Sequence, residues 1–226
     1  MKYSDNYNPE CWYKGVCEEC VGEDRCIKYT RMRLMMANSN IPVAKRVPIH
    51  LNIPKVDKTA YERLKDIRNN IYNFVYDGKS LYITSEIVGN GKTSSALKLL
   101  MGYFDELLDD DRYDDTPVGI FIHVPTLLVK LKDFKTTDYE FEKLKKDLMT
   151  ADLVVWDDIA STDMSAYDLS QLTVFIDNRI MNELSNIYTG NIISREDMSS
   201  ALGARLTSRI WNSKTEVVEF HGGDRR

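Results

Sequence analysis

The sequence predicts an α/β fold built on a parallel β-sheet, and three observations support this fold class. The segment Gly89-Asn90-Gly91-Lys92-Thr93 joins a strand-like run at 81–84 to a helical pattern at 94–108. Residues 118–122 form a near-continuous apolar run, which is typical of a parallel strand buried on both faces. Residues 153–156 form a similar run and end in two aspartates, where an open α/β sheet places its ligands.

The remaining elements follow from hydrophobic periodicity and from prolines. A short amphipathic helix is expected over 26–38, and the prolines at 42, 48 and 54 indicate a linker after it. Apolar residues at spacings of three or four predict a helix that begins at Asp57, with Tyr61, Leu64, Ile67, Ile71 and Phe74 on one face. A helix opening at Leu127, a long helix over 165–184 and a short strand over 186–191 are expected further on. We therefore expect a small N-terminal domain over 1–40, a linker over 41–56 and a main domain over 57–226.

Composition narrows the class of protein. The chain has 226 residues, 43% of them hydrophobic, and a net charge of -5, so bulk charge indicates neither disorder nor a polyanion-binding protein. The sequence contains no apolar run of about 18–20 residues, and its polar start lacks a secretory apolar region. A soluble cytoplasmic protein is therefore expected. The acidic tract over 109–115 lacks the glycine and the terminal glutamate of a calcium loop, and we interpret it as a solvated turn.

The glycine-rich segment predicts a phosphate-binding loop. Such a turn aims backbone N–H groups at a phosphate, and the dipole of the following helix favours negative charge. We expect Lys92 to reach the β- and γ-phosphates of ATP or ADP, and Thr93 to bind Mg²⁺. Glu86 stands where the usual pattern has a glycine, and an ordinary Gly-Asn-Gly turn with a surface lysine is the alternative. The residues expected to contact the nucleotide in this loop are Val88, Gly89, Asn90, Gly91, Lys92, Thr93 and Ser94.

Polar residues that end two strands are candidates for the chemistry. Asp157 is expected to hold Mg²⁺, and Asp158 is placed to polarise an attacking water, a general-base role. Asn191, at the end of the strand over 186–191, could orient that water beside the γ-phosphate. The alternatives are two acids that cap a turn and an asparagine that closes one.

All four cysteines fall close together near the N-terminus, as Cys11, Cys17, Cys20 and Cys26. With no histidine nearby, four thiolates would complete a tetrahedral Zn²⁺ site. A metal would also supply folding free energy to a segment that is too short to bury much surface. Two disulfides, free thiols or redox chemistry are the alternatives, and a reducing cytoplasm disfavours disulfides.

The helix expected after the cysteines is rich in methionine, with Met32, Met35 and Met36. Flexible thioethers suit an adaptable surface that binds a partner. An apolar face that packs on the main domain explains the same residues, and the sequence leaves both interpretations open.

Taken in order, these motifs resemble the AAA+ ATPases of the DnaC/DnaI-type bacterial helicase loaders. The resemblance covers about residues 57–226 and includes the phosphate loop, the Asp157-Asp158 strand, the segment 189–191, the segment 202–209 and the terminal segment 222–226. The cysteine-bearing N-terminus resembles the zinc-containing, helicase-binding region of the DnaI-like branch, which is often phage-encoded. The resemblance implies a five-stranded parallel sheet flanked by helices, with no C-terminal lid.

Residue by residue, the resemblance implies specific roles. The Walker A loop falls at Gly89, Gly91, Lys92 and Thr93, the Walker B carboxylates at Asp157 and Asp158, and sensor 1 at Asn191. Arg209 matches the arginine finger that acts on a neighbouring subunit's nucleotide, and Arg205 is the competing candidate. Arg226 falls where the family has an arginine near the nucleotide.

The implied function is that of an ATPase that binds a DnaB-type replicative helicase and delivers it onto single-stranded DNA. Hydrolysis is expected to be slow and to depend on self-association or on DNA. Lys130, Lys132 and Lys135 lie in the region that related initiators use for single-strand contact, although they are equally the polar side of an amphipathic helix. Two other hypotheses stay open: a transposition regulator of the IstB group, and a small-molecule P-loop kinase with a zinc finger.

Overall fold

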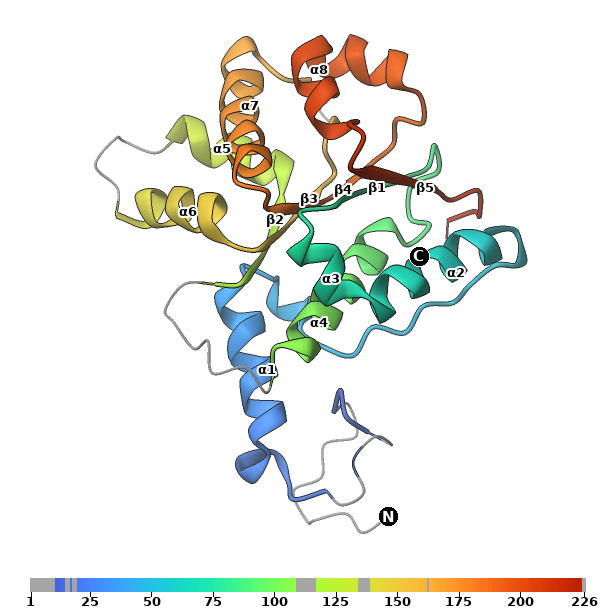
Figure 1. Ribbon diagram of the computed structural model, residues 1–226, viewed down its shortest axis with the longest axis vertical. Helices are drawn as coiled ribbons and strands as arrows, with labels where there is room; N and C mark the ends of the chain where they lie inside the picture. Colours follow the sequence, from blue (N-terminus) through green and yellow to red (C-terminus); the bar gives the residue numbers. More distant parts are fainter. Residues whose placement is uncertain are drawn as a thin grey trace.

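A five-stranded parallel sheet forms the centre of the computed structural model, which describes residues 11–14, 17, 20–108, 117–133, 139–161 and 163–224. The strand order is β2-β3-β4-β1-β5, so β4 lies between β1 and β3 (Figure 1). The strands are β1 (Ser80–Thr84), β2 (Gly119–His123), β3 (Leu153–Asp157), β4 (Ser185–Gly190) and β5 (Thr215–Glu219), and all neighbours pair in parallel. The predicted α/β fold with a parallel five-stranded sheet is therefore confirmed.

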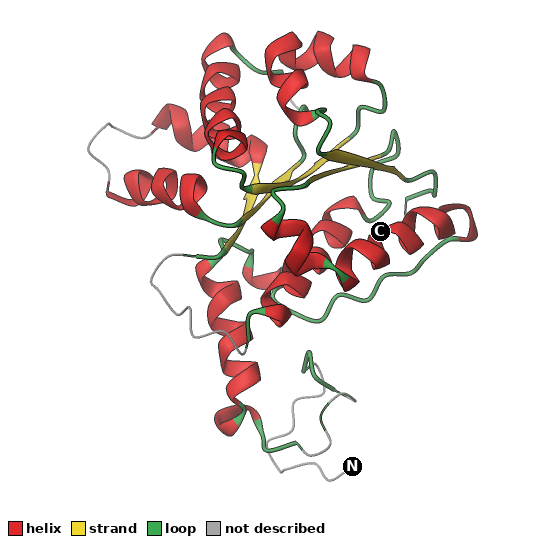
Figure 2. Cartoon of the chain, viewed as in Figure 1, coloured by secondary structure: helices red, strands yellow, loops and turns green. Residues whose placement is uncertain are grey.

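Helices cover both faces of this sheet, as Figure 2 shows. One layer contains α1 (Ile27–Asn38), α2 (Lys58–Asn69), α3 (Ile71–Tyr76) and α4 (Lys92–Glu106). The other contains α5 (Val124–Asp133), α6 (Tyr139–Thr150), α7 (Ala166–Met181) and α8 (Arg195–Ile210). Short 3-10 helices span Glu23–Arg25, Val43–Lys45 and Lys55–Asp57.

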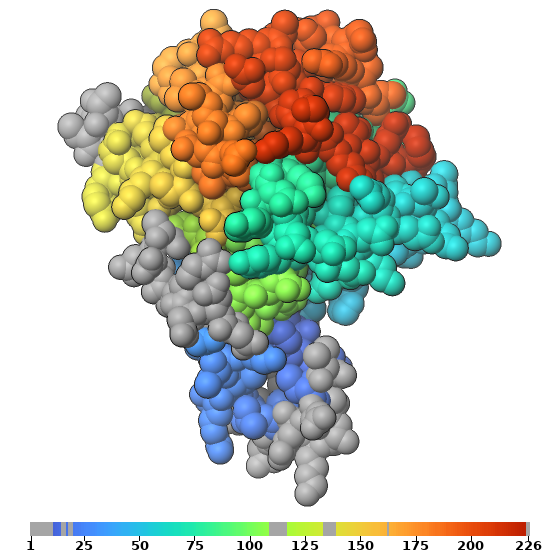
Figure 3. All heavy atoms as spheres, viewed as in Figure 1, coloured from blue at the N-terminus to red at the C-terminus, as the bar shows by residue number. Residues whose placement is uncertain are grey.

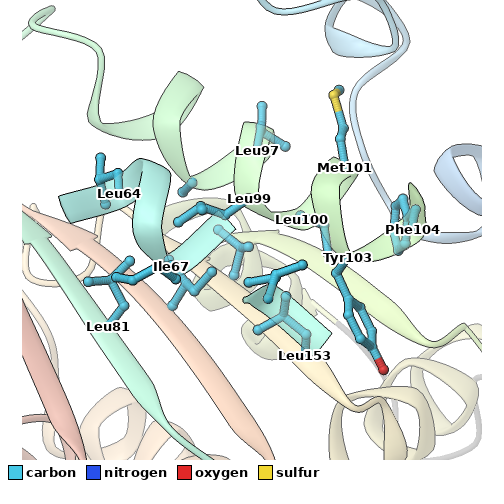
Figure 4. Packing of buried hydrophobic residues seen from close by; sticks show 14 of the residues in the cluster. Leu64, Ile67, Leu81, Leu97, Leu99, Leu100, Met101, Tyr103, Phe104 and Leu153 are labelled. Carbon is cyan, nitrogen blue, oxygen red and sulfur yellow. The ribbon is translucent and has the colours of Figure 1, made fainter. Parts of the chain in front are cut away.

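Alternation along the strands divides the core into two clusters, because successive side chains of a strand point to opposite faces. Leu81 and Leu153 join the cluster under α1 to α4, where they meet Leu64 and Leu99 (Figure 4). Tyr82, Val154 and other alternate residues join the second cluster, under α5 to α8. Near-continuous apolar strands were thus the correct signal for a sheet covered on both sides.

One helix differs from the expectation, and a second helix is interrupted. The apolar stripe that begins at Asp57 does not form one helix, because the backbone of Asn70 leaves the helical region with φ -123° and separates α2 from α3. Ile71 and Phe74 keep the same spacing across this break, so periodicity alone could not reveal it. Helix α8 is also interrupted, at Gly203, where φ is +76° and only glycine is unstrained.

The N-terminal helix α1 packs on the main body through Met32 and Met36, which are 1% and 0% exposed. Just after α1, the backbone N–H of Phe121 donates to Ser39 O (2.8 Å) and Asn40 Nδ2 donates to Phe121 O (3.0 Å). These bonds cover the outer edge of β2, which would otherwise present unpaired groups. The packing interpretation of the methionines is therefore the correct one for Met32 and Met36, and Figure 3 shows that the blue N-terminal part extends from one end of the molecule.

The C-terminal segment is fastened to the start of α2. The Asp57 carboxylate accepts hydrogen bonds from the backbone N–H groups of His221 (2.7 Å) and Gly222 (3.1 Å). The ring of Phe220 stacks on Tyr61 with centroids 4.9 Å apart.

No helix among the described residues is both long and apolar enough to span a membrane. The acidic tract 109–115, Lys135 and Arg226 lie outside the described residues.

A buried arginine joins α7 to the ends of two strands on the side opposite the phosphate loop. Arg179 is 0% exposed, and its guanidinium donates to Leu148 O and Ala151 O (both 2.8 Å) and to Asn186 Oδ1 (2.7 Å). Burial lowers the pKa of Arg179 to about 9, which still leaves it charged at neutral pH. Its planar fork of donors satisfies carbonyls that would otherwise be buried without partners.

Candidate nucleotide-binding site

The glycine-rich loop connects the end of β1 to the start of α4. Gly89 and Gly91 have φ of +78° and +98°, in the region that only glycine adopts without strain. Gly91 is also the N-cap of α4, and no side chain caps this helix end. The first turn of α4 therefore offers backbone N–H groups and a positive dipole end to an anion.

Side chains inside the loop hold its shape. Asn90 is fully buried and donates through Nδ2 to Ser85 Oγ, which also accepts the backbone N–H of Ile87 (3.1 Å). Lys92 folds back, and its Nζ donates to Ile87 O (2.9 Å) and to Asn90 Oδ1 (3.4 Å). Sequence reasoning assigned no role to Ser85, although a hydroxyl directly after the strand was a usable signal. The Asn90 side chain is thus a structural member of the loop.

The structure brings Thr93 of α4 and Asp157 of β3 into contact at the carboxyl edge of the sheet. Asp157 is 4% exposed and accepts a hydrogen bond from the Thr189 hydroxyl at 2.8 Å. Burial raises the pKa of Asp157, while the nearby hydroxyls of Thr93 and Thr189 act in the opposite direction. Burial also lowers the pKa of Lys92, while the negative charges of Asp158 and Asp157 act to raise it. The lysine and both carboxylates therefore share one electrostatic environment.

Thr189 connects the two aspartates, a role that the sequence did not suggest. Its hydroxyl donates to Asp157 Oδ1 and accepts the backbone N–H of Asp158 (3.0 Å). Asp158 has φ of +58°, which is uncommon for a residue with a side chain. The sharp turn after β3 thus has strained backbone of a kind typical of functional sites, and oxygens of the two carboxylates lie within 4.8 Å of each other.

His123 is a further residue of the site that sequence reasoning missed. It ends β2 and pairs in register with Asp157 of β3. Its Nε2 lies 3.6 Å from Asp158 Oδ2, and its Nδ1 lies 2.8 Å from Thr126 Oγ1. Ligand atoms of His123, Asp157 and Asp158 lie within 4.8 Å of one another, so this group could hold a cation. The available signal was a polar residue that ends an apolar strand beside the aspartate strand.

Asn191 follows β4, the strand between the phosphate-loop strand and the aspartate strand. Its Oδ1 is buried and has no hydrogen-bond partner among the described residues. The preceding residue must be a glycine, because a Cβ at Gly190 would lie 2.7 Å from the hydroxyl oxygen of Tyr82. An orphaned buried oxygen in a native fold calls for an explanation, and a bound group is one.

The candidate finger arginines lie on α8, after the interruption at Gly203. Arg209 donates through Nε to Asp177 Oδ1 on α7, and Arg205 donates to Asp177 Oδ2 (2.9 Å). Burial alone would raise the pKa of Asp177, but hydrogen bonds from Arg209 and Arg205 hold it below its ordinary value. In the described structure, both arginines thus bind their own subunit's α7.

The lysines considered for nucleic-acid contact are not equivalent. The Nζ of Lys132 lies 3.0 Å from Asp168 Oδ2, so a carboxylate of α7 already compensates its charge. Lys130 lines a pocket of about 390 Å³ with Arg46 and His123.

The four cysteines are free thiols, and each is partly buried. Burial raises the pKa of Cys11, and the charges of Cys26, Cys17 and Cys20 add to this effect, so the four sulfurs interact. Within the described part of the chain, the group of ligand atoms close enough to share a cation is the His123 group, and no metal site is shown at the thiols.

Comparisons with known proteins identify the fold. No family model matches the sequence, and no curated protein matches it. Solved structures do match, and they share its fold, a five-stranded parallel sheet flanked by helices. The matching structures include a DnaC helicase loader, a DnaI structure and DnaA replication initiators.

Three of these structures illustrate the likeness. A crystal structure of the DnaC helicase loader has a TM-score of 0.59 at 21% identity, covering 81% of this chain and 97% of that chain. A crystal structure of DnaI has a TM-score of 0.55 at 20% identity, covering 78% and 88%. The replication initiator DnaA bound to AMPPCP and single-stranded DNA has a TM-score of 0.52 at 16% identity, covering 76% and 49%.

Proposed function

We propose that this chain is an ATP-dependent helicase loader, which binds a DnaB-type replicative helicase and delivers it onto single-stranded DNA. The observation that carries the nucleotide part is the contact of Thr93 with Asp157, beside Lys92 and at the open N-terminus of α4. The fold likeness to DnaC and DnaI loaders supports the biological role.

The residues present fit a nucleotide and its magnesium ion. Backbone N–H groups over 88–94 and the Lys92 ammonium would hold the phosphates, and Thr93 and Asp157 offer the oxygen ligands that Mg²⁺ prefers. When bound, the ion neutralises phosphate charge and orients the phosphate oxygens. Asp158 polarises the attacking water as general base, and Asn191, whose Oδ1 has no partner in the described part of the chain, orients it.

Nucleotide binding is tested by calorimetry with MgATP and with ADP. Micromolar or tighter binding that is lost on Lys92→Ala supports the proposal. A folded wild-type chain with no affinity for either nucleotide refutes it.

Arg209 acts in trans in this proposal. Each subunit would present Arg209 to the nucleotide of its neighbour, so that hydrolysis depends on self-association and is slow in the isolated chain. We expect Arg209→Ala to leave nucleotide affinity unchanged and to lower hydrolysis in the assembled complex, and Arg205→Ala to have the smaller effect. Equal hydrolysis by wild type and Arg209→Ala in the assembled state would exclude this role.

Arg226 is proposed to lie near the nucleotide. Replacement of Arg226 by alanine should then lower the affinity for ATP, and unchanged affinity would contradict this position.

The N-terminal domain over 1–40 is proposed to bind the helicase, with a linker over 41–56 joining it to the ATPase domain over 57–226. We propose that Cys11, Cys17, Cys20 and Cys26 hold one Zn²⁺. The four thiols are free and close enough for their charges to affect the pKa of Cys11, and together they provide a complete set of soft ligands. One zinc per chain by elemental analysis supports this, and a metal-free folded protein contradicts it. Chelation should loosen α1 first, visible as faster hydrogen exchange over 27–38.

The loader role is tested by mixing the chain with the replicative helicase of its cell, with and without ATP, and weighing the complex by light scattering. A nucleotide-dependent complex supports the proposal. A complex with a transposase instead would favour the IstB-like function, and turnover of a small acceptor without stimulation by DNA would favour the kinase. Contact of Lys130, Lys132 and Lys135 with single-stranded DNA predicts salt-dependent binding that weakens when these lysines are replaced.

A further inference from the structure

A cavity of about 630 Å³ lies between the linker, α2 and α4, and its lining contains none of the residues assigned to the nucleotide. Its apolar wall is formed by Leu51 and Ile53 of the linker, Tyr61 and Leu64 of α2, and Leu99 of α4. Leu64 and Leu99 face each other from their two helices in Figure 4. This volume and this apolar wall suit a small organic molecule.

A buried hydroxyl beside this cavity has no hydrogen-bond partner among the described residues. Ser95 of α4 lines the cavity and is 2% exposed, and its Oγ has no hydrogen-bond partner among the described residues. Buried hydroxyls in folded proteins are almost always hydrogen-bonded, to protein or to another bound molecule. A polar group of a ligand would satisfy this oxygen after a small shift of the neighbouring side chains, because the oxygen itself is fully buried.

The charges around the cavity are mostly positive: Lys58, Lys65, Arg68 and Lys98 against Glu62. Lys58 pairs with Glu62 (3.7 Å), and Arg68 pairs with Asp105 (3.2 Å) outside the cavity lining. Lys98 is partly buried, and its Nζ donates to a neutral group, the backbone oxygen of Ile49 (3.1 Å). Burial and the nearby Arg68 lower the pKa of Lys98, as expected for a cation without a counter-charge.

We propose that this cavity binds a small amphipathic anion, with its apolar body against Leu51, Tyr61 and Leu99 and its anionic head near Lys98 and the Ser95 hydroxyl. The head would supply both the missing counter-charge and the missing hydrogen-bond partner. Ser95 and Lys98 follow Lys92 on the same helix, so the site adjoins the phosphate loop and is separate from it. The inference holds whether or not the chain loads a helicase.

The test uses the full-length chain and the fluorescent probe 8-anilinonaphthalene-1-sulfonate, which has an aromatic body and one anionic group. We expect saturable binding at one site in the wild type. Lys98→Gln should weaken it about tenfold, as for the loss of one charge-assisted hydrogen bond. Lys146→Gln is the matched control, because Lys146 is an exposed lysine on α6, on the other face of the sheet.

A second variant keeps the test decisive if Lys98→Gln fails to fold. Ile53 is 49% exposed at the cavity, so Ile53→Glu adds a negative charge there without disturbing the core. This variant should lower the affinity for the probe by a similar factor. Naphthalene-1-sulfonate should displace the probe at lower concentration than 1-naphthol, which has the same rings without the charge.

Two outcomes would overturn the proposal. Equal affinity of the probe for wild type, Ile53→Glu and the lysine variants would indicate an adventitious additive only. Displacement of the probe by MgATP from wild type but not from Lys92→Ala would place the probe in the nucleotide site. Circular dichroism and thermal unfolding of each variant establish that the fold is retained.

Discussion

Arg209 of α8 is hydrogen-bonded to Asp177 of α7 within the same chain. Arg205 binds the other oxygen of the same carboxylate, so one aspartate holds both candidate finger arginines. An arginine that must reach a neighbour's phosphate has to leave this partner first. If Arg209 acts as proposed, the free energy of the pair would oppose finger insertion, and exchange of Asp177 for the phosphate would become part of assembly.

Asp177→Asn should raise hydrolysis in the assembled complex, because Arg209 no longer has to leave a charged partner. Exposed ion pairs contribute about 0.5–1 kcal/mol, which corresponds to roughly a two- to fivefold increase in rate. ATP turnover of wild type and variant is measured across a concentration series of the chain. Arg209→Ala in the Asp177→Asn background is the control and should remove the gain. A rate unchanged or lowered by Asp177→Asn would show that the pair does not restrain the arginine.

The Asp177 pair also predicts a pH dependence of stability. Hydrogen bonds from Arg209 and Arg205 outweigh the effect of burial and keep the pKa of Asp177 below its ordinary value of 3.8. The unfolded chain therefore binds more protons than the folded chain in that range, so the contribution is complete above the ordinary value and is lost as pH falls through the lower one. Urea unfolding should show wild type more stable than Asp177→Asn by about 1 kcal/mol at pH 7, and the difference should shrink toward pH 3. A difference that is independent of pH would contradict this account.

Features encoded within short stretches could be predicted from the sequence. The apolar runs around Ile120 and Val154 identify buried parallel strands without reference to anything distant. Gly89 and Gly91 indicate a turn whose backbone needs positive φ, and Lys92 lies at the start of the helix that follows this turn. These local signals were sufficient for β1 to β4 and for the backbone of the glycine-rich loop, whereas they predicted no strand over Thr215–Glu219, where β5 lies.

The unpredicted parts depend on register and on helix packing. His123 meets Asp158 only because β2 and β3 are neighbours in the sheet, 35 residues apart along the chain. Asp177 meets Arg209 only because α7 and α8 pack together. The break at Asn70 could not be predicted for a different reason: the apolar residues of α3 continue the spacing of those in α2, so the sequence pattern does not change where the helix ends.

Lys92→Ala should weaken MgATP binding by about 10- to 100-fold, because one charge-assisted hydrogen-bonding group to phosphate is lost. Folding should survive, since burial lowers the pKa of Lys92 and its ammonium is therefore a costly group to bury in the nucleotide-free protein. Isothermal calorimetry measures affinity, and thermal unfolding measures stability. Lys79→Ala is the matched control, as Lys79 is an exposed lysine before β1 that pairs with Asp77. Equal affinities of the two variants would remove Lys92 from the phosphate site.

The Thr189 hydroxyl offers the sharpest test of the site, because one oxygen supports both aspartates. Thr189→Val preserves shape but leaves Asp157 without one donor and the Asp158 N–H without its acceptor. We expect a loss of about 1–3 kcal/mol in the free energy of unfolding, because buried polar groups lose their partners. Turnover of ATP should fall more than ATP affinity, since Asp158 would lose its fixed direction.

Thr189→Ser is the control for this change, because serine keeps the oxygen and removes only a methyl group. Stability and turnover of Thr189→Ser should stay much closer to wild type than those of Thr189→Val. If the serine variant is impaired and the valine variant matches wild type in urea unfolding and in single-turnover hydrolysis, the methyl packing matters and the hydroxyl does not. The two carboxylates would then be held by the turn at Asp158 itself, with its positive φ, rather than by the strand between them.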